Sequence, residues 1–108
     1  MNPWLATEVV RGETDVVVRL VGAIDIATLP DLRRALDPEV RPGATVVVDL
    51  AGVSFLSSDG AVAFNEAQQA LRRVGGRLVL WRPHPIAEQV LNLFDSLDVR
   101  RGAFPSTA

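Results

Sequence analysis

Two serines and a carboxylate follow an apolar run in the middle of the chain. Residues 46–60 read VVVDLAGVSFLSSDG, so an expected strand leads through a turn to Ser57, Ser58 and Asp59 at the start of a helix. The first turn of a helix has free backbone N–H groups and the positive end of the helix dipole, which suits a phosphate group. The serine loop (residues 57–60) therefore predicts either a serine that is phosphorylated or a helix cap worth about 1 kcal/mol. Spacing alone does not decide which serine is the cap.

Alternation and periodicity predict the elements that position this loop. Apolar runs bounded by turn residues predict strands, and apolar residues spaced three and four apart predict helices. The expected strands cover residues 4–10, 16–21, 45–50 and 77–81, and the expected helices begin after a capping Thr28, at residue 59 and at residue 86. The order ββαβαβα predicts an α/β fold with a mixed β-sheet of about four to five strands packed with helices. The first two strands form a hairpin, and the later connections are right-handed crossovers.

Spacing also predicts which side of each helix is buried. In the helix over residues 59–74, Gln68 falls on the wet side, and the expected buried stripe is Phe64, Ala67, Leu71 and Val74. For the helix that starts at residue 86, the expected inward set is Ile86, Val90, Leu93 and Leu97. Gly75 and Gly76 suit a left-handed C-cap. From residue 100 onward we expect a short edge segment or a frayed tail.

The composition bounds the class of protein. The 108 residues suffice for one domain over 1–108, with a core over about 5–100 and a tail at 101–108. Eleven basic and thirteen acidic residues give a net charge of −2, which argues against a nucleic-acid-binding surface. No apolar run approaches the roughly 20 residues of a membrane span, and the first residues lack a signal-peptide pattern. The absence of cysteine excludes disulfides and thiolate metal sites and fits a cytoplasmic protein.

Three further polar residues lie where expected elements meet. Asp25 and Asp49 each end a strand, and such residues are more often turn or capping residues than acid–base or metal-binding groups. Asp49 is expected to hold residues 50–54 through their backbone amides. His84, the single histidine, lies between two prolines at a helix start, where we expect a capping or surface role. Because Ser58 lacks a G-x-S-x-G elbow and His84 follows a different strand, a serine hydrolase is disfavoured.

Three blocks of sequence, in register along the chain, resemble the STAS domain of bacterial anti-sigma factor antagonists. The first block is residues 22–25 (GAID) with Thr28. The second is residues 46–50 (VVVDL) and 53–56 (VSFL) with the serine loop, and the third is residues 78–80 (LVL), 90–93 (VLNL) and 97–98 (LD). Together they span about residues 5–100. The resemblance implies a single STAS-like domain that is not an enzyme and that regulates transcription by binding another protein.

The resemblance also implies a site and its partners. In such antagonists the loop reads Asp-Ser-[Ser/Thr]-Gly, and Ser58 takes the position of the phosphorylated serine, with Ser57 as the second choice. The implied partner is an anti-sigma factor with serine-kinase activity, which holds ATP and Mg²⁺, so no cofactor or metal is expected on this chain. The unphosphorylated antagonist binds that factor, which then releases a sigma factor. Phosphate on Ser58 switches this binding off, and a serine phosphatase restores it.

The expected partner-binding surface surrounds the serine loop. Its members are Asp25, Ser57, Ser58, Asp59, Gly60, Ala61 and Val62. Ala61 and Val62 are expected to form the floor of a docking patch, because the first helical turns hold more apolar residues than one buried stripe needs. Whether the chain forms a weak homo-oligomer, through an edge strand or an exposed tryptophan, stays open.

Asp59 departs from the usual loop and puts a carboxylate beside the acceptor. Two alternatives within the same fold therefore stay open. One is a scaffold or accessory subunit of a stress-signalling complex that is never phosphorylated. The other is a module of a transport system that handles a lipid or another small ligand.

Overall fold

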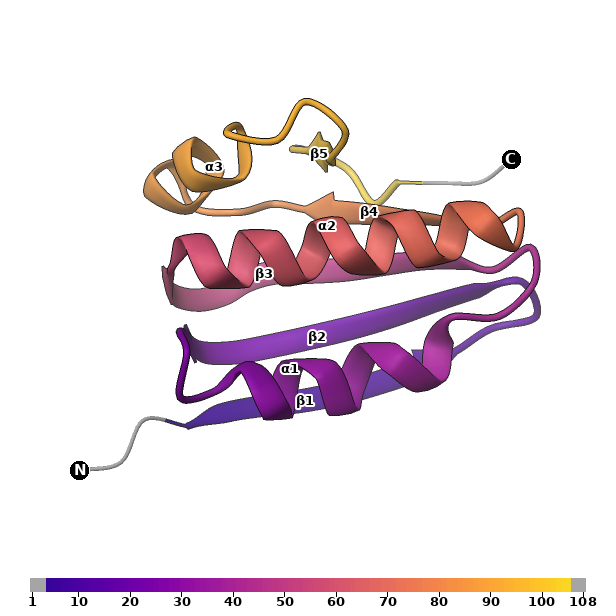
Figure 1. Ribbon diagram of the computed structural model, residues 1–108, viewed down its shortest axis with the longest axis horizontal. Coiled ribbons are helices and arrows are strands. Elements are labelled where there is room, and N and C mark those ends of the chain that lie inside the picture. Colours follow the sequence, from indigo (N-terminus) through magenta and orange to yellow (C-terminus); the bar gives the residue numbers. More distant parts are fainter. Residues whose placement is uncertain (1–3, 106–108) are drawn as a thin grey trace.

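The computed structural model describes residues 4–105, which form five strands, three α-helices and one short 3-10 helix. The elements are β1 (Leu5–Arg11), β2 (Asp15–Ile24), α1 (Leu29–Leu36), η1 (Asp37–Glu39), β3 (Thr45–Leu56), α2 (Ser58–Arg73), β4 (Arg77–Trp81), α3 (Pro85–Leu91) and β5 (Asp98–Arg100). The strands form one sheet in the order β1-β2-β3-β4-β5, in which β1 runs antiparallel to β2 and the other pairs are parallel (Figure 1). The expected hairpin, mixed sheet and α/β class are confirmed.

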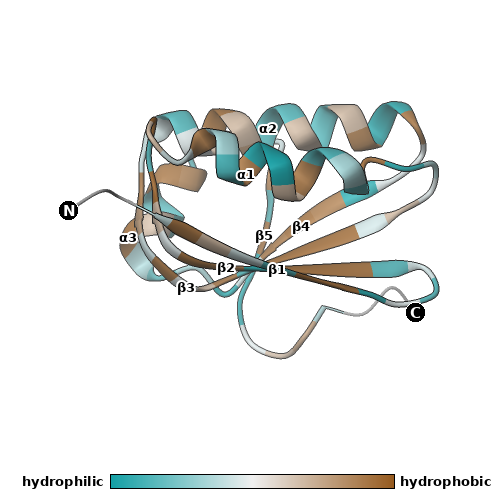
Figure 2. Ribbon diagram, turned by 90° about the horizontal axis from the view of Figure 1, so that it is seen from below, coloured by the Kyte–Doolittle hydropathy of each residue, from teal (hydrophilic) through white to brown (hydrophobic). Residues whose placement is uncertain are grey.

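Helices α1 and α2 cover one face of the sheet (Figure 2). Alternate residues of the inner strands turn toward them and are fully buried, among them Val18, Val48 and Leu80. Phe64 from α2 and Leu32 from α1 pack into the same cluster. The nearly continuous apolar run of β3 fits its central position, because a central parallel strand is covered on both faces.

The C-terminal segment covers part of the opposite face. Val47 and Val79 are fully buried although they lie outside the main core cluster. Phe104 meets the Trp81 ring edge-on with ring centroids 5.1 Å apart, and the Trp81 indole N–H donates to the Gly102 carbonyl at 3.1 Å. Residues 101–105 therefore form a strap against Trp81 of β4, after β5 has formed the short edge strand expected near residue 100.

Strand β3 is six residues longer than its apolar run predicted. The extension pairs with β2 alone, because β4 ends at Trp81 opposite Asp49, whereas β2 continues to Ile24 opposite Leu56. The register between β2 and β3 shifts between Arg19 and Val21, so the extension is irregular. Residues 51–56 mix small and polar residues with apolar ones, and no single periodicity marks them as a strand.

The predicted face of α2 is correct at Phe64 and Leu71 and wrong at two positions. Gln68 is buried, not wet: its side chain accepts from the Leu78 N–H at 2.8 Å and donates to the Leu78 carbonyl at 3.3 Å. Val74 is exposed because the helix ends at Arg73 and the chain turns away. The left-handed cap is confirmed at Gly75, whose φ is 76°.

The predicted inward face of α3 is also wrong at two positions. Ile86 and Leu93 are both exposed, whereas Ala87 and Leu91 are buried. The helix ends at Leu91, so Leu93 falls in the following turn. Helix α3 is only about two turns long and has apolar residues on more than one side. Its packing on the rest of the fold therefore decides which side is buried.

Candidate functional site

Ser57 is the cap of α2 and is fixed by three hydrogen bonds. Its hydroxyl oxygen accepts from the Gly60 N–H at 3.3 Å, and its carbonyl accepts from the Ala61 N–H at 3.2 Å. Its own N–H donates to the Ile24 carbonyl at 2.9 Å, which ties the serine loop to the end of β2. These bonds decide the order of the two serines, because the residue that precedes the helix satisfies the orphan donors of the first turn.

Ser58 is the first residue of α2, and its side chain is exposed. Across residues 4–105 its hydroxyl has no hydrogen-bond partner, in contrast to the capping Ser57. Asp59 follows in the same turn, is exposed and forms no ion pair within that range. A free hydroxyl at the positive end of a helix dipole is accessible to a phosphoryl donor.

Asp25 shapes the neighbouring turn between β2 and α1. Its carboxylate accepts from the Ala27 N–H at 3.0 Å and from the Thr28 N–H at 3.2 Å. Thr28 precedes α1 but does not cap it, which corrects the expected role: its buried hydroxyl donates to the Ala23 carbonyl at 2.8 Å and accepts from the Asp25 N–H at 3.0 Å. The turn lies beside the serine loop because Ile24, directly before Asp25, accepts from Ser57.

Gly60 and Ala61 are buried and cannot offer side-chain surface to a partner, which corrects their expected place in a docking patch. A Cβ at Gly60 would lie 2.6 Å from Ile24 Cγ2 and 2.7 Å from Leu56 Cδ1. Glycine thus lets the start of α2 touch the ends of β2 and β3. Val62 is exposed, as expected.

Two exposed apolar residues that sequence reasoning missed flank the serine loop. Ile26 follows Asp25 in its turn and is 73% exposed, and Phe55 lies near the end of β3 and is 54% exposed. With Val62 on α2 they form the apolar collar, which comprises Ile26, Phe55 and Val62. A large apolar residue that breaks the polar character of a turn is a signal that could have identified Ile26. Exposed aromatic and aliphatic groups of this kind are typical of protein interfaces.

Asp49 lies in a separate ion-pair cluster on the sheet. Its buried carboxylate accepts two hydrogen bonds from Arg82, both 2.9 Å long, and one from Arg19 at 3.4 Å. It also accepts from the Ala51 N–H at 3.0 Å, the one backbone contact of the expected kind. The hydrogen bonds from Arg82 hold the pKa of Asp49 below its usual value, against the opposing effect of burial. Asp49 is therefore structural and takes no part in the serine loop.

His84 precedes α3 but its side chain does not cap the helix. Its Nε2 lies 2.9 Å from the Ala51 carbonyl oxygen, and the ring makes no hydrogen bond to either serine of the loop. Residues 4–105 contain no cluster of three or more histidine or acidic side chains that could hold a metal ion. Within the same range no helix is long and apolar enough to cross a membrane.

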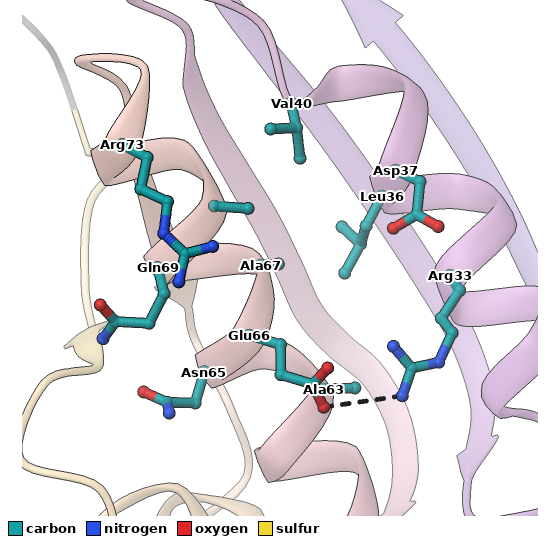
Figure 3. Close-up of a pocket in the computed structure, with 11 residues that line it drawn as sticks. Arg33, Leu36, Asp37, Val40, Ala63, Asn65, Glu66, Ala67, Gln69 and Arg73 are labelled. Atoms are coloured by element: carbon teal, nitrogen blue, oxygen red, sulfur yellow. Dashed lines mark ion pairs between the residues drawn. The ribbon is translucent and has the colours of Figure 1, made fainter.

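A cavity of about 430 Å³ lies between α1 and α2, away from the serine loop (Figure 3). The Arg33 and Glu66 side chains meet across it at 3.7 Å. Its apolar wall includes Leu36 and Val40, and none of its lining residues belongs to residues 57–60. The exposed part of the serine loop, Ser58 and Asp59, therefore lies outside this cavity.

The fold and this loop define a known class: the chain belongs to the STAS domain family, whose model matches residues 6–106. The anti-sigma-B factor antagonist of Bacillus subtilis is 32% identical over 88 residues, which cover 82% of this chain and 78% of the relative. The anti-sigma F factor antagonist of Lysinibacillus sphaericus is 32% identical over 85 residues, covering 77% of this chain and 72% of the relative. The resemblance of the three sequence blocks is confirmed.

Solved structures show the same fold. The anti-sigma factor antagonist SpoIIAA in its unphosphorylated form matches with a TM-score of 0.75 and 23% identity, over 91% of this chain and 89% of that chain. An anti-sigma factor antagonist from Mycobacterium paratuberculosis matches with a TM-score of 0.70 and 24% identity, over 95% of this chain and 87% of that chain. The phosphorylated form of SpoIIAA matches with a TM-score of 0.69.

Replacement of Gly60 by alanine tests how tightly α2 sits on the strand ends. The added Cβ meets Ile24 and Leu56 well inside normal contact distance, so Gly60→Ala should lower the free energy of unfolding by about 1 to 3 kcal/mol despite its better helix propensity. Urea denaturation measures this. Ser58→Ala is the matched control and should change stability by less than about 0.5 kcal/mol. A Gly60→Ala protein as stable as the control would contradict the close approach.

The Asp49 cluster predicts a specific pH dependence. Since its pKa is lowered in the folded state, Asp49 contributes stability above its unfolded pKa of about 4 and loses that contribution as the pH falls through the folded value. Asp49→Asn should lower the free energy of unfolding by about 2 kcal/mol at ~pH 7, and this difference from wild type should shrink toward ~pH 3. Denaturation curves at several pH values measure it. Asp31→Asn, which breaks an exposed pair with Arg34, is the control; an equal loss at both pH values would contradict the prediction.

Proposed function

We propose that this protein is an anti-sigma factor antagonist that is controlled by phosphorylation of Ser58. It binds an anti-sigma factor that is also a serine kinase, and this binding releases a sigma factor. The observation that carries the proposal is the free, exposed hydroxyl of Ser58 at the first position of α2. Membership of the STAS family and the similarity to proteins named anti-sigma factor antagonists support it.

The docking surface proposed for the partner is the exposed part of the serine loop, the Asp25 turn and the apolar collar. Ile26, Phe55 and Val62 offer exposed apolar area on the three segments that meet at the loop, and Ser58 is exposed as well. Binding there would bring the hydroxyl to ATP and Mg²⁺ held by the kinase. A serine phosphatase that removes the phosphate would reset the antagonist, which acts here as a cytoplasmic binding protein.

Electrostatics supports phosphate as an off-switch. A phosphoserine carries about −1.5 to −2 charge, which would add to the unpaired carboxylate of Asp59. The arginines of the described chain that form ion pairs do so elsewhere, so none of these pairs neutralises the first turn of α2. Placing that charge in a desolvated interface without a partner costs several kcal/mol, which is enough to convert tight binding into weak binding.

Ser58 should accept one phosphoryl group from the cognate anti-sigma factor, identified by pull-down from the native cell. Wild type, Ser58→Ala and Ser57→Ala are incubated with that factor, ATP and Mg²⁺, and the products are mapped by mass spectrometry. We expect phosphate on wild type and Ser57→Ala and none on Ser58→Ala. The Ser57→Ala variant loses its cap and about 1 kcal/mol of stability, so its folding is checked by circular dichroism. Phosphate on Ser57, or none at all, would refute the assignment.

A negative charge at position 58 should weaken partner binding. Ser58→Asp is expected to raise the Kd for the anti-sigma factor by at least about 30-fold, because it places an unpaired charge in a desolvated interface. Such a change corresponds to about 2 kcal/mol, since 1.4 kcal/mol is a factor of ten. Thr14→Asp adds the same charge at the hairpin turn, at the opposite end of the parallel strands, and should leave the Kd within about twofold. Isothermal titration calorimetry compares the two. Equal effects of both changes would count against a docking surface at Ser58.

Asp59 favours one alternative function. As an exposed, unpaired carboxylate in the first turn of α2, it gives the loop a permanent negative charge that opposes a second one. A STAS scaffold that is never phosphorylated would carry such a loop. The phosphorylation experiment separates the two, and an Asp59→Ser variant that is modified no faster than wild type would argue against a suppressing role for the carboxylate.

A further inference from the structure

The two edges of the sheet differ in how they are protected. Strand β5 is three residues long, which leaves little free backbone at that edge. Strand β1 has seven residues, contains no proline and pairs with β2 in an unbroken register. Proteins normally blunt an exposed edge with a short strand, a proline, a bulge or charges, because its free N–H and C=O groups can pair with another chain. The β1 edge has few of these protections.

The side chains around this edge are largely apolar. Trp4 is 58% exposed and Val10 is 57% exposed, and the strap of residues 101–105 packs against Trp81 of β4 instead. The charges of β1 are each paired: Glu8 forms an ion pair of 3.1 Å with Arg19 of β2, and Arg11 forms one with Glu39. A surface that is apolar and locally neutral is poorly suited to nucleic acid and well suited to a second strand with similar side chains.

We propose that two copies of this chain associate through their β1 strands, which pair antiparallel about a two-fold axis at Thr7. In that register Thr7 faces Thr7 of the second copy. Leu5 faces Val9, Trp4 faces Val10 and Ala6 faces Glu8. Apolar residues therefore meet apolar residues, and no two like charges lie directly opposite, as favourable cross-strand pairing requires. A two-fold interface is self-complementary, and this strand is self-complementary about Thr7.

The neighbouring register is disfavoured by the same side chains. An axis at Glu8 would place the two Glu8 carboxylates opposite each other and would set Leu5 against Arg11. Arg11 is already engaged on its own chain, where it holds the buried Glu39 at 2.6 Å. Like charges directly opposite destabilise an antiparallel pair, so the side chains of β1 favour the axis at Thr7 over the axis at Glu8.

A cysteine placed on the axis tests both the contact and its register. The natural chain has no cysteine, so Thr7→Cys carries a single thiol at an exposed position. Directly opposed residues in an antiparallel pair have Cα atoms about 4.5–5.5 Å apart, within the range of a disulfide. We expect Thr7→Cys to form a disulfide-linked dimer under mild oxidation. Glu8→Cys is the matched control: its two copies would lie diagonally, with the residues about 7–8 Å apart, and should link at least about tenfold more slowly.

Sedimentation of the reduced proteins provides the second measurement. Wild type should show a concentration-dependent monomer–dimer equilibrium, and Thr7→Asp should raise the dimer Kd by about fivefold or more, because two carboxylates then meet on the axis. Thr14→Asp should leave it within about twofold. Faster linking through Glu8→Cys, or an unchanged Kd in Thr7→Asp, would overturn the proposal. A wild type that stays monomeric would also overturn it and would leave the β1 edge to a strand of another protein.

Discussion

The pairing of β3 with β2 beyond the end of β4 is the constraint on which the serine loop depends. Strand β3 continues to Leu56 opposite Ile24, and the next N–H, from Ser57, donates to the Ile24 carbonyl. Gly60 then allows α2 to begin against the same two side chains. One strand pairing thus places the Asp25 turn, the cap of α2 and the Ser58 hydroxyl next to one another, on a rigid scaffold at one end of the sheet (Figure 1).

The buried carboxylates of this protein are paired with arginine, whereas an exposed carboxylate in the serine loop is not. Asp49 and Glu39 are buried carboxylates, and each is held by arginine through short hydrogen bonds. Asp59 is exposed and has no such partner. Buried charge must be paired to be tolerated, whereas a charge at the positive end of a helix dipole is stabilised without a partner. A further negative charge on Ser58 is therefore acceptable to the free protein and unfavourable once water is excluded.

The two faces of the sheet have different coverings, and the two proposed partner surfaces lie apart on this sheet. Helices α1 and α2 cover one face (Figure 2), and on the C-terminal side the strap packs against Trp81 of β4 through Phe104. The β1 edge is two strands away from β3, which leads to Ser58. A pair of chains joined at β1 would therefore present two serine loops rather than bury them.

Local sequence was enough to predict the order of elements, the hairpin, the glycine cap after α2 and the family, because turn residues and apolar runs act within a few positions. It could not tell that Gln68 is buried or that Ile86 is exposed, since each outcome depends on which distant strand packs against the helix. The serine pair was visible in the sequence as a helix start. Its division into a capping Ser57 and a free Ser58 is decided in the folded chain, where the Ser57 hydroxyl accepts from the Gly60 N–H. The Ser57 N–H is held there by the Ile24 carbonyl, a contact across 33 positions that strand pairing creates.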